Sequence, residues 1–432
     1  MCIRDSILGK LKKILEEGVE EEEEILQTKI VSPKEVAKEW KKWLPSAEDE
    51  VHSLLTEKQA LLPLAAQKVT DFMEEAKRRG VKVELIPSKL VFARKPGKNG
   101  GKLKVRWVIC GNFESKQPEE TNYSGGADAS AFRIMILLAA RHQWEGTSLD
   151  VKTAFLNAEM TFKDDEHLML VLPPTFFVER GFMEKDTYYL PQKAVYGLRR
   201  SPRLWGEHRD EAMRKFEIKV QEEGKEKKMK LKALDSEPNL WKVVFEEDES
   251  EEMKGLVMTY VDDLFIVGPQ EITKAIREHV QKTWTTSSPQ DVSEVPIKFL
   301  VMEVSKEWDH QAERFAWFIS QSSYVEDLLS TGEEKLKARK IPMTRDQASM
   351  EPIEEMPSQA QIRSAQKVVG ELLWLVTRTR PDLMFSVSRM GANILRSPQA
   401  VAEAGIQAKG YLLGTKTPVS YTHLTLPTKL EV

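Results

Sequence analysis

Cysteine is scarce in this sequence, which contains only Cys2 and Cys110 among 432 residues. Two cysteines are too few for a disulfide framework or a zinc site, and their scarcity fits a reduced intracellular setting. Long apolar runs are also missing, because the longest, Ile134 to Ala140, is far too short to span a bilayer. With 41% hydrophobic and 31% charged residues, the chain is neither a disordered polar chain nor a membrane protein. Its length predicts roughly two to four domains.

The chain also lacks a strong net charge, since its formal charge is −4. Positive charge is nevertheless segregated. Residues 82–106 hold eight Lys and Arg against one acidic residue, Glu84. A second basic stretch carries Lys193, Arg199, Arg200, Arg203, Arg209, Arg214 and Lys215. Acidic charge gathers in Glu20–Glu24 and Glu246–Glu252. Each basic stretch is either a solvated face or a phosphate-binding surface, and the sequence leaves both readings open.

The two ends of the sequence differ in character from the rest. Residues 1–6 (MCIRDS) and 419–429 (VSYTHLTLPTK) resemble conceptual translations of sequencing adapters. We therefore expect non-native ends at 1–6 and 417–432. Residues 1–6 are not a secretory signal, because no apolar segment follows them, and we expect an intracellular protein, in a cytoplasmic particle or the nucleus, that is not secreted.

The predicted elements mix strands and helices without regular alternation, which favours an α+β fold. Helical spacing predicts helices over 33–43, 51–62 and 69–79, with Pro63 as a break. Strand signals follow at 81–87, 89–95 and 104–110, around a turn cluster at 96–101 that predicts a hairpin.

The middle of the chain predicts further elements. Residues 132–144 are apolar on nearly every side and predict a buried helix that Gly146 ends, before a short strand at 147–151. Other segments are interpreted as a loop at 171–177, charged surface insertions at 219–237 and 246–254, and a helix at 363–379 that ends by Pro381.

Two adjacent aspartates, Asp262 and Asp263, lie between the apolar runs of residues 255–268. Both flanks are β-prone, so the pair falls at the tip of a predicted hairpin. Aspartate is a common turn residue, which is one explanation. The other is a cation site, because carboxylate oxygens are hard ligands suited to Mg²⁺.

A third carboxylate, Asp150, ends the strand-like segment TSLDV. It is either the N-cap of the segment that follows or a partner of the aspartate pair. Phosphoryl transfer with two metals about 3.5–4 Å apart draws carboxylates from separate chain segments. Asp150, Asp262 and Asp263 together provide that inventory.

Five ordered blocks carry a resemblance to a known family. They are LDVKTAFLN (149–157), AVYGLRRSPRLW (194–205), YVDDLFIVG (260–268), KFLVMEV (298–304) and TRPDLMFSVSRM (379–390). In this order and spacing they resemble the reverse transcriptase of copia-type retrotransposons, over about residues 36–416. The resemblance implies a right-hand polymerase, with basic fingers, an antiparallel palm sheet that carries the YVDD hairpin, and a helical thumb.

The resemblance also assigns roles at the carboxylates. Asp150 and Asp262 would bind two Mg²⁺ ions, with Mn²⁺ as an alternative, and the carbonyl of Val151 would assist. Asp263 would be the second acid of the hairpin, near the primer end. The primer 3′-hydroxyl would attack the α-phosphate of a deoxynucleoside triphosphate (dNTP).

Substrate contacts are implied in the same way. The dNTP would meet Lys95, Arg106, Phe155 and Tyr196, with Phe155 excluding a ribose 2′-hydroxyl by a steric clash. Residues assigned to the nucleic acid are Gly197, Arg199, Arg200, Arg203 and Tyr260. For Lys95 a solvated position is an equal alternative, and for Phe155 a core position.

This sequence departs from the family pattern at two positions. Val301 stands where the hairpin near the primer usually has glycine, and Arg200 replaces a glutamine. Gln192 resembles a retroviral motif residue, but the family spacing places the matching position at Tyr196.

The implied organisation is a charged arm (1–32), a helical segment (33–80), fingers and palm (81–305) and a thumb-like region (306–416). The implied partners are an RNA template, a DNA or RNA primer and dNTPs, with no membrane. Ribonuclease H and integrase parts of the same polyprotein are not expected in this chain.

Three functions remain open from the sequence. The leading prediction is an RNA-directed DNA polymerase. The first alternative is a decayed or domesticated copy that binds RNA–DNA duplexes without polymerising. The second is a Mg²⁺-dependent glycosyl or nucleotidyl transferase, which predicts neither basic fingers nor a helical thumb.

Overall fold

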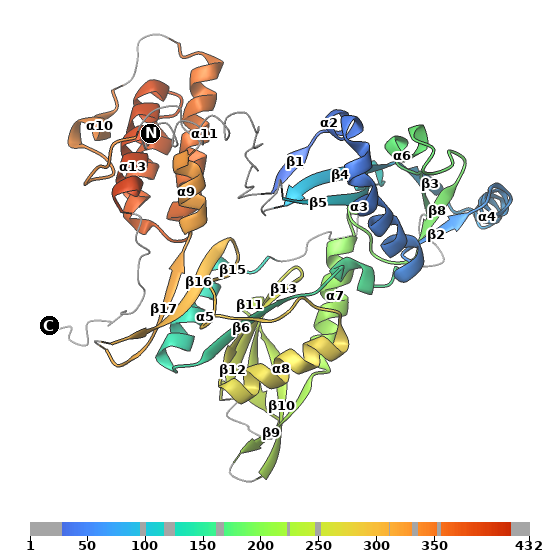
Figure 1. Cartoon of the computed structure of the whole chain (residues 1–432), viewed down its shortest axis with the longest axis horizontal. Helices are drawn as coiled ribbons and strands as arrows, with labels where there is room; N and C mark the ends of the chain where they lie inside the picture. Colours follow the sequence, from blue (N-terminus) through green and yellow to red (C-terminus); the bar gives the residue numbers. More distant parts are fainter. Residues whose placement is uncertain are drawn as a thin grey trace, which may run out of the picture. The chain divides into compact units, whose positions relative to one another are not determined.

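The computed structural model describes residues 28–95, 101–115, 126–160, 168–222, 225–246, 252–310, 312–330, 336–351 and 356–415. The chain divides into two compact units, Met1–Ser124 with Thr153–Asp210 and Gly125–Lys152 with Glu211–Val432. Each unit is therefore discontinuous in sequence, and each is described by itself below (Figure 1). The mixture of sheets and helices agrees with the predicted α+β class.

The first unit contains two small sheets. One has the order β1-β4-β5 and the other β2-β8-β7-β3. Their strands are β1 (Lys29–Val31), β2 (Leu61–Leu64), β3 (Val83–Ile86), β4 (Ser88–Lys95), β5 (Lys102–Ile109), β7 (Leu168–Val171) and β8 (Tyr188–Pro191). The helices are α2 (Pro33–Lys38), α3 (Trp40–His52), α4 (Ala66–Arg78), α6 (Thr175–Glu179) and α7 (Ser201–Arg214), the last of which continues across the unit boundary.

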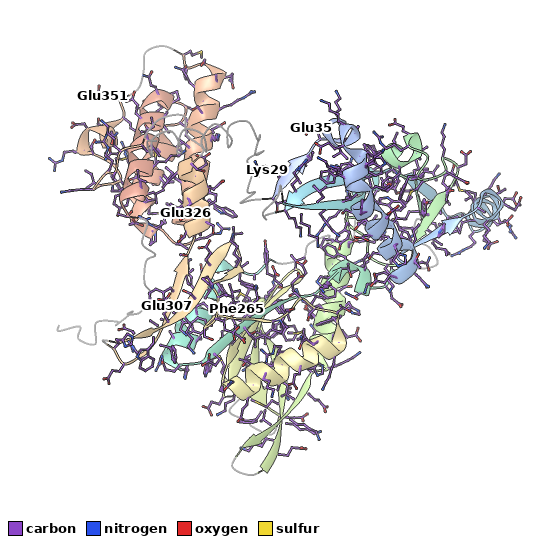
Figure 2. All side chains as sticks on the ribbon, in the orientation of Figure 1. Lys29, Glu35, Phe265, Glu307, Glu326 and Glu351 are labelled. Carbon is purple, nitrogen blue, oxygen red and sulfur yellow. The ribbon has the colours of Figure 1, made fainter. Side chains whose placement is uncertain are left out.

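Local sequence explains how this unit begins. Ser32 and Glu35, the latter labelled in Figure 2, form a capping box around the start of α2, where Pro33 occupies the first turn. Strands β4 and β5 pair in antiparallel register from Ser88 opposite Ile109 to Lys95 opposite Lys102. The predicted hairpin is therefore present, although most of its turn cluster lies outside the described residues.

Helix α3 covers the open edge of β5. Ser46 and Glu50 accept the outward N–H groups of Val105 and Trp107, at 3.0 and 2.9 Å. Four helical residues rise about 6 Å and two strand residues about 7 Å, so these side chains match alternate edge amides. Glu50 is buried, and burial raises its pKa despite the opposing effect of Trp107 N–H, Lys104 and Arg106. The edge strand is thereby protected from pairing with another chain.

The second unit is built on a seven-stranded sheet of order β14-β6-β13-β12-β11-β10-β9 (Figure 1). Its strands are β6 (Glu145–Asp150), β9 (Glu217–Glu222), β10 (Lys225–Leu234), β11 (Glu237–Phe245), β12 (Gly255–Tyr260), β13 (Asp263–Gly268) and β14 (Gln290–Asp291). A second sheet contains β15 (Ile297–Phe299), β16 (Met302–Asp309) and β17 (Arg314–Ser320).

Helices complete the second unit. They are α5 (Ala129–Arg141), α8 (Gln270–Thr283), α9 (Ser322–Ser330), α10 (Arg345–Ser349), α11 (Gln359–Val376), α12 (Met384–Ala392) and α13 (Pro398–Gly414). The helix predicted at 363–379 corresponds to α11, and a 3₁₀ turn begins at Pro381. Phe265, labelled in Figure 2, packs edge-on against Phe132 at 5.2 Å and against Phe299 at 5.2 Å, which joins β13, α5 and β15 in one core.

Two sequence predictions were wrong. Leu61–Leu64 is the edge strand β2 and not a helix end, since an edge strand tolerates Pro63. The short helix Thr175–Glu179 begins within the loop predicted at 171–177 and runs past its end. Strands β9 and β10 overlap the predicted surface insertion at 219–237 and lie at one end of the main sheet, so its status as an insertion stays a prediction.

Two further predictions about α5 need correction. Gly146 does not end the helix but lies within β6, where a Cβ would come 2.4 Å from the Trp317 ring. The helix itself is only half buried, because Ile134 is 56% exposed. In the part of the chain that the structure describes, no helix is long and apolar enough to cross a membrane.

Candidate active site

Two of the three predicted carboxylates are neighbours across a pair of strands. Asp150 ends β6, Asp263 begins β13, and the two pair in antiparallel register. Val151 N–H donates to the Asp262 carbonyl at 2.8 Å, so the amide of Asp150 points away from β13. Asp150 and Asp263 are therefore a pair without mutual backbone hydrogen bonds, in which Cα atoms approach to about 4.5 Å and side chains lie closest.

The local structure argues against the simpler roles of these aspartates. Asp150 is a strand residue, and the short 3₁₀ helix that follows has Thr153 as its N-cap. Asp262 lies in the two-residue turn between β12 and β13, where a turn role would be ordinary. Asp263 lies outside that turn, in the strand, so turn geometry does not account for it.

The hairpin tip is strained. Val261, the first turn residue, has φ of 55° and is 41% exposed. Positive φ is costly for a β-branched residue, by roughly 1–3 kcal/mol. The flanking strands hold the tip in place because residues 256–258 and 264–267 are buried throughout.

Electrostatics at the tip are unfavourable without a counter-charge. Burial, followed by the charges of Asp262 and Asp150, raises the pKa of Asp263 to about 7. The donor set suits a divalent cation, since three carboxylates provide hard oxygen ligands and a cation would relieve their repulsion. Among the described residues, however, no group of three or more His, Cys, Asp and Glu side chains is gathered closely enough to hold a metal ion.

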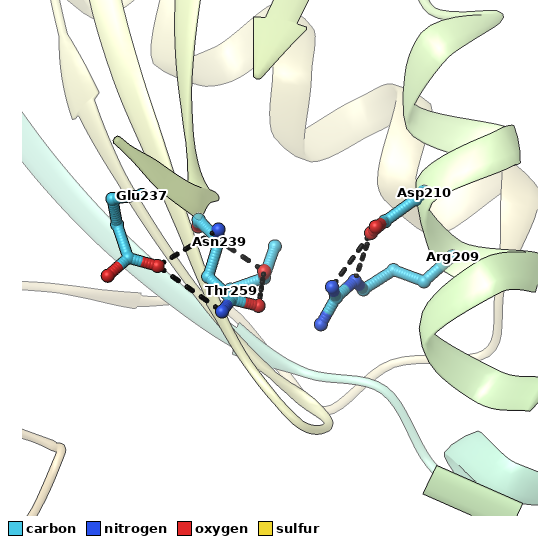
Figure 3. Close-up of polar contacts among 5 residues, drawn as sticks. All are labelled: Arg209, Asp210, Glu237, Asn239 and Thr259. Carbon is cyan, nitrogen blue, oxygen red and sulfur yellow. Dashed lines mark hydrogen bonds and ion pairs between the residues drawn. The ribbon is translucent and has the colours of Figure 1, made fainter. Parts of the chain in front are cut away.

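A polar network supports the hairpin from β11 (Figure 3). Asn239 donates from its backbone and its side chain to Glu237, at 3.1 and 3.3 Å. The hydroxyl of Thr259, a fully buried residue, donates to the Asn239 carbonyl at 3.3 Å. Glu237 in turn accepts the Asp128 N–H at 3.2 Å. The network ties β12, one residue before Tyr260, to β11 and to the start of α5.

Tyr260 lies at a pocket of about 650 Å³ within the second unit. The pocket is also lined by Val301 and by Trp374 and Arg378 of the α11 region. The Arg378 guanidinium stacks on the Trp374 ring at 3.4 Å from its centroid. The sequence analysis names Tyr260 but not Trp374 or Arg378, although their four-residue spacing within the predicted helix at 363–379 indicates that the two side chains can meet.

Three of the predicted dNTP-binding residues meet in the first unit. The Arg106 guanidinium lies over the Tyr196 ring, 4.8 Å from its centroid, and Tyr196 packs edge-on against Phe155 at 5.5 Å. Phe155 is half buried, so it is not a core residue. Lys95 is exposed at the end of β4. By register it shares a face with Arg106, about 14 Å further along the ladder.

The residues that follow Tyr196 make mainly structural contacts. Gly197 has φ of 95°, and a Cβ there would come 2.0 Å from the Ile109 carbonyl oxygen. Arg199 donates to the Gly111 and Asn112 carbonyls, at 2.7 and 3.2 Å. Arg200 is buried at 6% exposure, and Arg203 pairs with Glu207 at 3.1 Å. Contact of these residues with nucleic acid stays a prediction.

The departure from the family pattern at Val301 is visible as backbone strain. Residues Phe299 and Met302 pair across a turn made by Leu300 and Val301, whose φ values are 50° and 64°. Two successive positive φ values favour Asn-Gly rather than Leu-Val. The hairpin predicted at 298–304 is therefore formed, and Val301 occupies a position suited to glycine.

Residues 78–342 match the family model described as reverse transcriptase (RNA-dependent DNA polymerase). The match covers more than half of the chain, and the chain belongs to this family. It is the reverse transcriptase domain of a copia-type element.

Three relatives show the likeness. The chain is 26% identical over 272 residues to the Ty5-1 transposon protein of Saccharomyces cerevisiae, which covers 62% of this chain and 76% of that protein. It is 25% identical over 301 residues to the retrovirus-related Pol polyprotein from transposon TNT 1-94 of Nicotiana tabacum, over 66% of this chain and 20% of the polyprotein. It is 24% identical over 317 residues to that from transposon RE2 of Arabidopsis thaliana, over 71% of this chain and 19% of the polyprotein.

Proposed function

We propose that this chain copies RNA into DNA by transferring deoxynucleotides from dNTPs to a primer 3′-hydroxyl, with Asp150, Asp262 and Asp263 as the catalytic carboxylates. The observation that carries the proposal is the strand register that sets Asp150 against Asp263, with Asp262 beside them in the turn. Bound divalent cations would lower the pKa of the attacking hydroxyl and neutralise charge on the triphosphate.

The chain's own residues have separate tasks in this proposal. The carboxylates of Asp150 and Asp262, with the Val151 carbonyl, hold the two Mg²⁺ ions, and Mn²⁺ can replace them. Asp263 has a pKa of about 7 when no cation is present, so it begins as a mixture of protonated and ionised forms at neutral pH. Ionisation of Asp263 is then favoured as cations bind, because opposite charge stabilises a carboxylate.

The contact series Arg106–Tyr196–Phe155 supports a dNTP site in the first unit. Arg106 would neutralise the triphosphate, with Lys95 as a second cation. Phe155, which is packed against Tyr196 and held in one place, would exclude a ribose 2′-hydroxyl. The template and primer would contact the segment of Gly197, Arg199, Arg200 and Arg203, and Tyr260 would lie near the primer end.

A right-hand architecture is part of the same proposal. Fingers and palm would span residues 81–305, and the thumb-like region 306–416 would contain the helices α9 to α13. Residues 33–80 would pack as a helical segment on the fingers, since α3 covers β5. Of the predicted arm (1–32), Lys29–Val31 is strand β1 and pairs with β4, so this part belongs with the fingers in the proposal. The predicted tail (417–432) lies outside the described residues.

Primer extension on an RNA template with Mg²⁺ tests the proposal. Asp262→Asn should abolish extension, because it removes a charged ligand with almost no change in shape. Asp235→Asn is the matched control, since Asp235 is an exposed turn residue of the same sheet, and it should extend at the wild-type rate. Extension by Asp262→Asn at the wild-type rate would refute the assigned role.

The alternative is a chain that binds RNA–DNA duplex without polymerising. Duplex binding without extension by the wild-type chain would favour it. The presence of all three carboxylates and of Phe155 favours an active enzyme. In both cases phosphate contacts should make nucleic-acid binding weaken steeply with salt.

A further inference from the structure

A serine outside the predicted site holds the backbone of Asp150 from the side opposite β13. The Asp150 N–H donates to the Ser287 hydroxyl at 3.0 Å, and the Ser287 N–H donates to the Asp150 carbonyl at 2.8 Å. Ser287 lies between α8 and β14, in the segment that runs beside the end of β6. Two hydrogen bonds in opposite directions thus join the two residues.

The Ser287 hydroxyl takes the place that a backbone carbonyl has in a regular ladder. Gln290 pairs with Ser148, whereas Thr286 pairs with Val151. From Thr286 to Gln290 the chain advances four residues, whereas the paired stretch of β6 from Ser148 to Val151 advances three. The segment 286–290 therefore contains one extra residue, as in a β-bulge. Irregularities of this kind twist a strand locally, redirect side chains and are common beside active sites.

We infer that Ser287 is a positioning residue for the Asp150 carboxylate, and the inference rests on the proposed function of Asp150 as a metal ligand. Ser287 fixes the Asp150 backbone on one side, and the Val151 N–H fixes the next residue to Asp262 on the other. With both sides held, rotation about the side-chain bonds is the main freedom left to this carboxylate. Partners behind a ligand typically affect metal affinity or activity about 10–100-fold.

Ser148 offers a matched control in the same strand. It lies two residues before Asp150, and it is buried. Its hydroxyl donates to the Leu264 carbonyl of β13 at 3.0 Å. Replacing either serine with alanine removes one hydroxyl and one hydrogen bond beside β6, but the Ser287 hydroxyl bonds Asp150 whereas the Ser148 hydroxyl bonds Leu264.

The experiment compares Ser287→Ala, Ser287→Thr and Ser148→Ala in the full chain. Mn²⁺ affinity is measured by electron paramagnetic resonance, and amide hydrogen exchange is followed in peptides that cover residues 147–152. We expect Ser287→Ala to bind Mn²⁺ about tenfold more weakly and to exchange faster at Asp150. Ser287→Thr keeps a hydroxyl and should restore both. Ser148→Ala should lose stability while its Mn²⁺ affinity stays at the wild-type value.

Primer extension supplies a second readout. The Mg²⁺ concentration for half-maximal rate should rise about tenfold in Ser287→Ala, while KM for the template–primer stays constant. Equal Mn²⁺ affinities for Ser287→Ala and Ser148→Ala would overturn the positioning role. If Ser287→Ala does not fold, Ser287→Cys, a weaker acceptor of similar size, takes its place in the same comparison.

Failure of the inference and failure of the proposed function give different results. A wild-type chain that extends primers, with an unchanged Ser287→Ala, refutes the role of Ser287 alone. A wild-type chain that binds Mn²⁺ and loses affinity in Ser287→Ala, but never extends a primer, supports the role of Ser287 and refutes polymerase activity. A wild-type chain that neither binds Mn²⁺ nor extends primers refutes both.

Discussion

Replacing Gly197 with alanine should destabilise the first unit more than the same replacement at a glycine whose Cβ position is open to solvent. Gly197 has φ of 95°, and its Cβ would meet the Ile109 carbonyl oxygen at 2.0 Å. Two backbone hydrogen bonds depend on this close approach, from Ile109 N–H to the Tyr196 carbonyl and from Gly111 N–H to the Gly197 carbonyl, at 2.8 and 3.1 Å. The added Cβ would clash with the backbone of Ile109, so the clash cannot be relieved by moving a flexible side chain.

The magnitude follows from these parts. Positive φ costs an alanine roughly 1–2 kcal/mol, and each lost backbone hydrogen bond costs about 1 kcal/mol. We expect Gly197→Ala to lower the free energy of unfolding by about 3–4 kcal/mol. The same shift would move Tyr196 away from Arg106, which stacks on its ring, so KM for dNTP should rise.

Gly80→Ala is the matched control. Gly80 belongs to the same unit and has φ of 70°, but nothing lies within 4 Å of its Cβ position. This variant isolates the cost of positive φ, roughly 1–2 kcal/mol. Urea unfolding, followed by fluorescence that includes the buried Trp107, measures both variants. If Gly197→Ala is no more destabilising than Gly80→Ala, the close approach to β5 is not what requires glycine here.

Three further predictions concern the second unit. Gly146→Ala should lower the free energy of unfolding by roughly 1–3 kcal/mol, since its Cβ would come 2.4 Å from the buried Trp317 ring, and thermal unfolding measures it; a neutral result would mean that the ring moves freely. Val301→Gly should raise the free energy of unfolding by about 1 kcal/mol, because φ of 64° suits glycine and the valine is 51% exposed; a loss of stability in denaturant would contradict this. For Asp263 the pKa in the fold, about 7, lies above the ordinary value of 3.8, so its stabilising contribution is complete below about pH 4 and lost as pH rises through 7. With chelator present, Asp263→Asn should therefore be more stable than wild type at pH 8, by about 2 kcal/mol after allowance for solvent screening. At pH 4 the two proteins should be equally stable. The same stability difference at both pH values would refute the reasoning.

The sequence predicted the hairpin at the candidate site because the signals there are local. The two apolar runs around Asp262 and Asp263 favour a short hairpin, and the observed β12–β13 pair agrees with this. The pairing of Asp150 with Asp263 depends on strand order, which no local pattern encodes. The ordered family motifs supplied that expectation instead.

Where local pattern failed, the long-range environment had decided the structure. Gly146 follows an apolar helical segment, as a glycine at a helix end does, yet it lies within strand β6. The ring of Trp317, far along the chain, packs where a side chain at position 146 would be. Pro63 has the mark of a helix break, yet it lies in an edge strand that needs no amide there. Ser287 carried no signal at all, because its hydroxyl matters only where the register slips by one residue.

The unfavourable placement of Asp263 at the hairpin tip separates a functional explanation of the aspartate pair from a purely structural one. A turn requires one residue such as Asp262 and gains nothing from a second, half-buried carboxylate in the next strand position. The fold instead sets Asp263 against Asp150 in the closest type of strand pair. Burial, followed by the charges of Asp262 and Asp150, raises the pKa of Asp263 to about 7. An asparagine at position 263 would avoid that repulsion with the same shape. Under the proposed function a bound cation offsets this cost. Stability should therefore respond to Mg²⁺ in the wild type and much less in Asp263→Asn, which thermal unfolding with and without Mg²⁺ measures. Equal responses of the two proteins would contradict a contribution of Asp263 to cation binding.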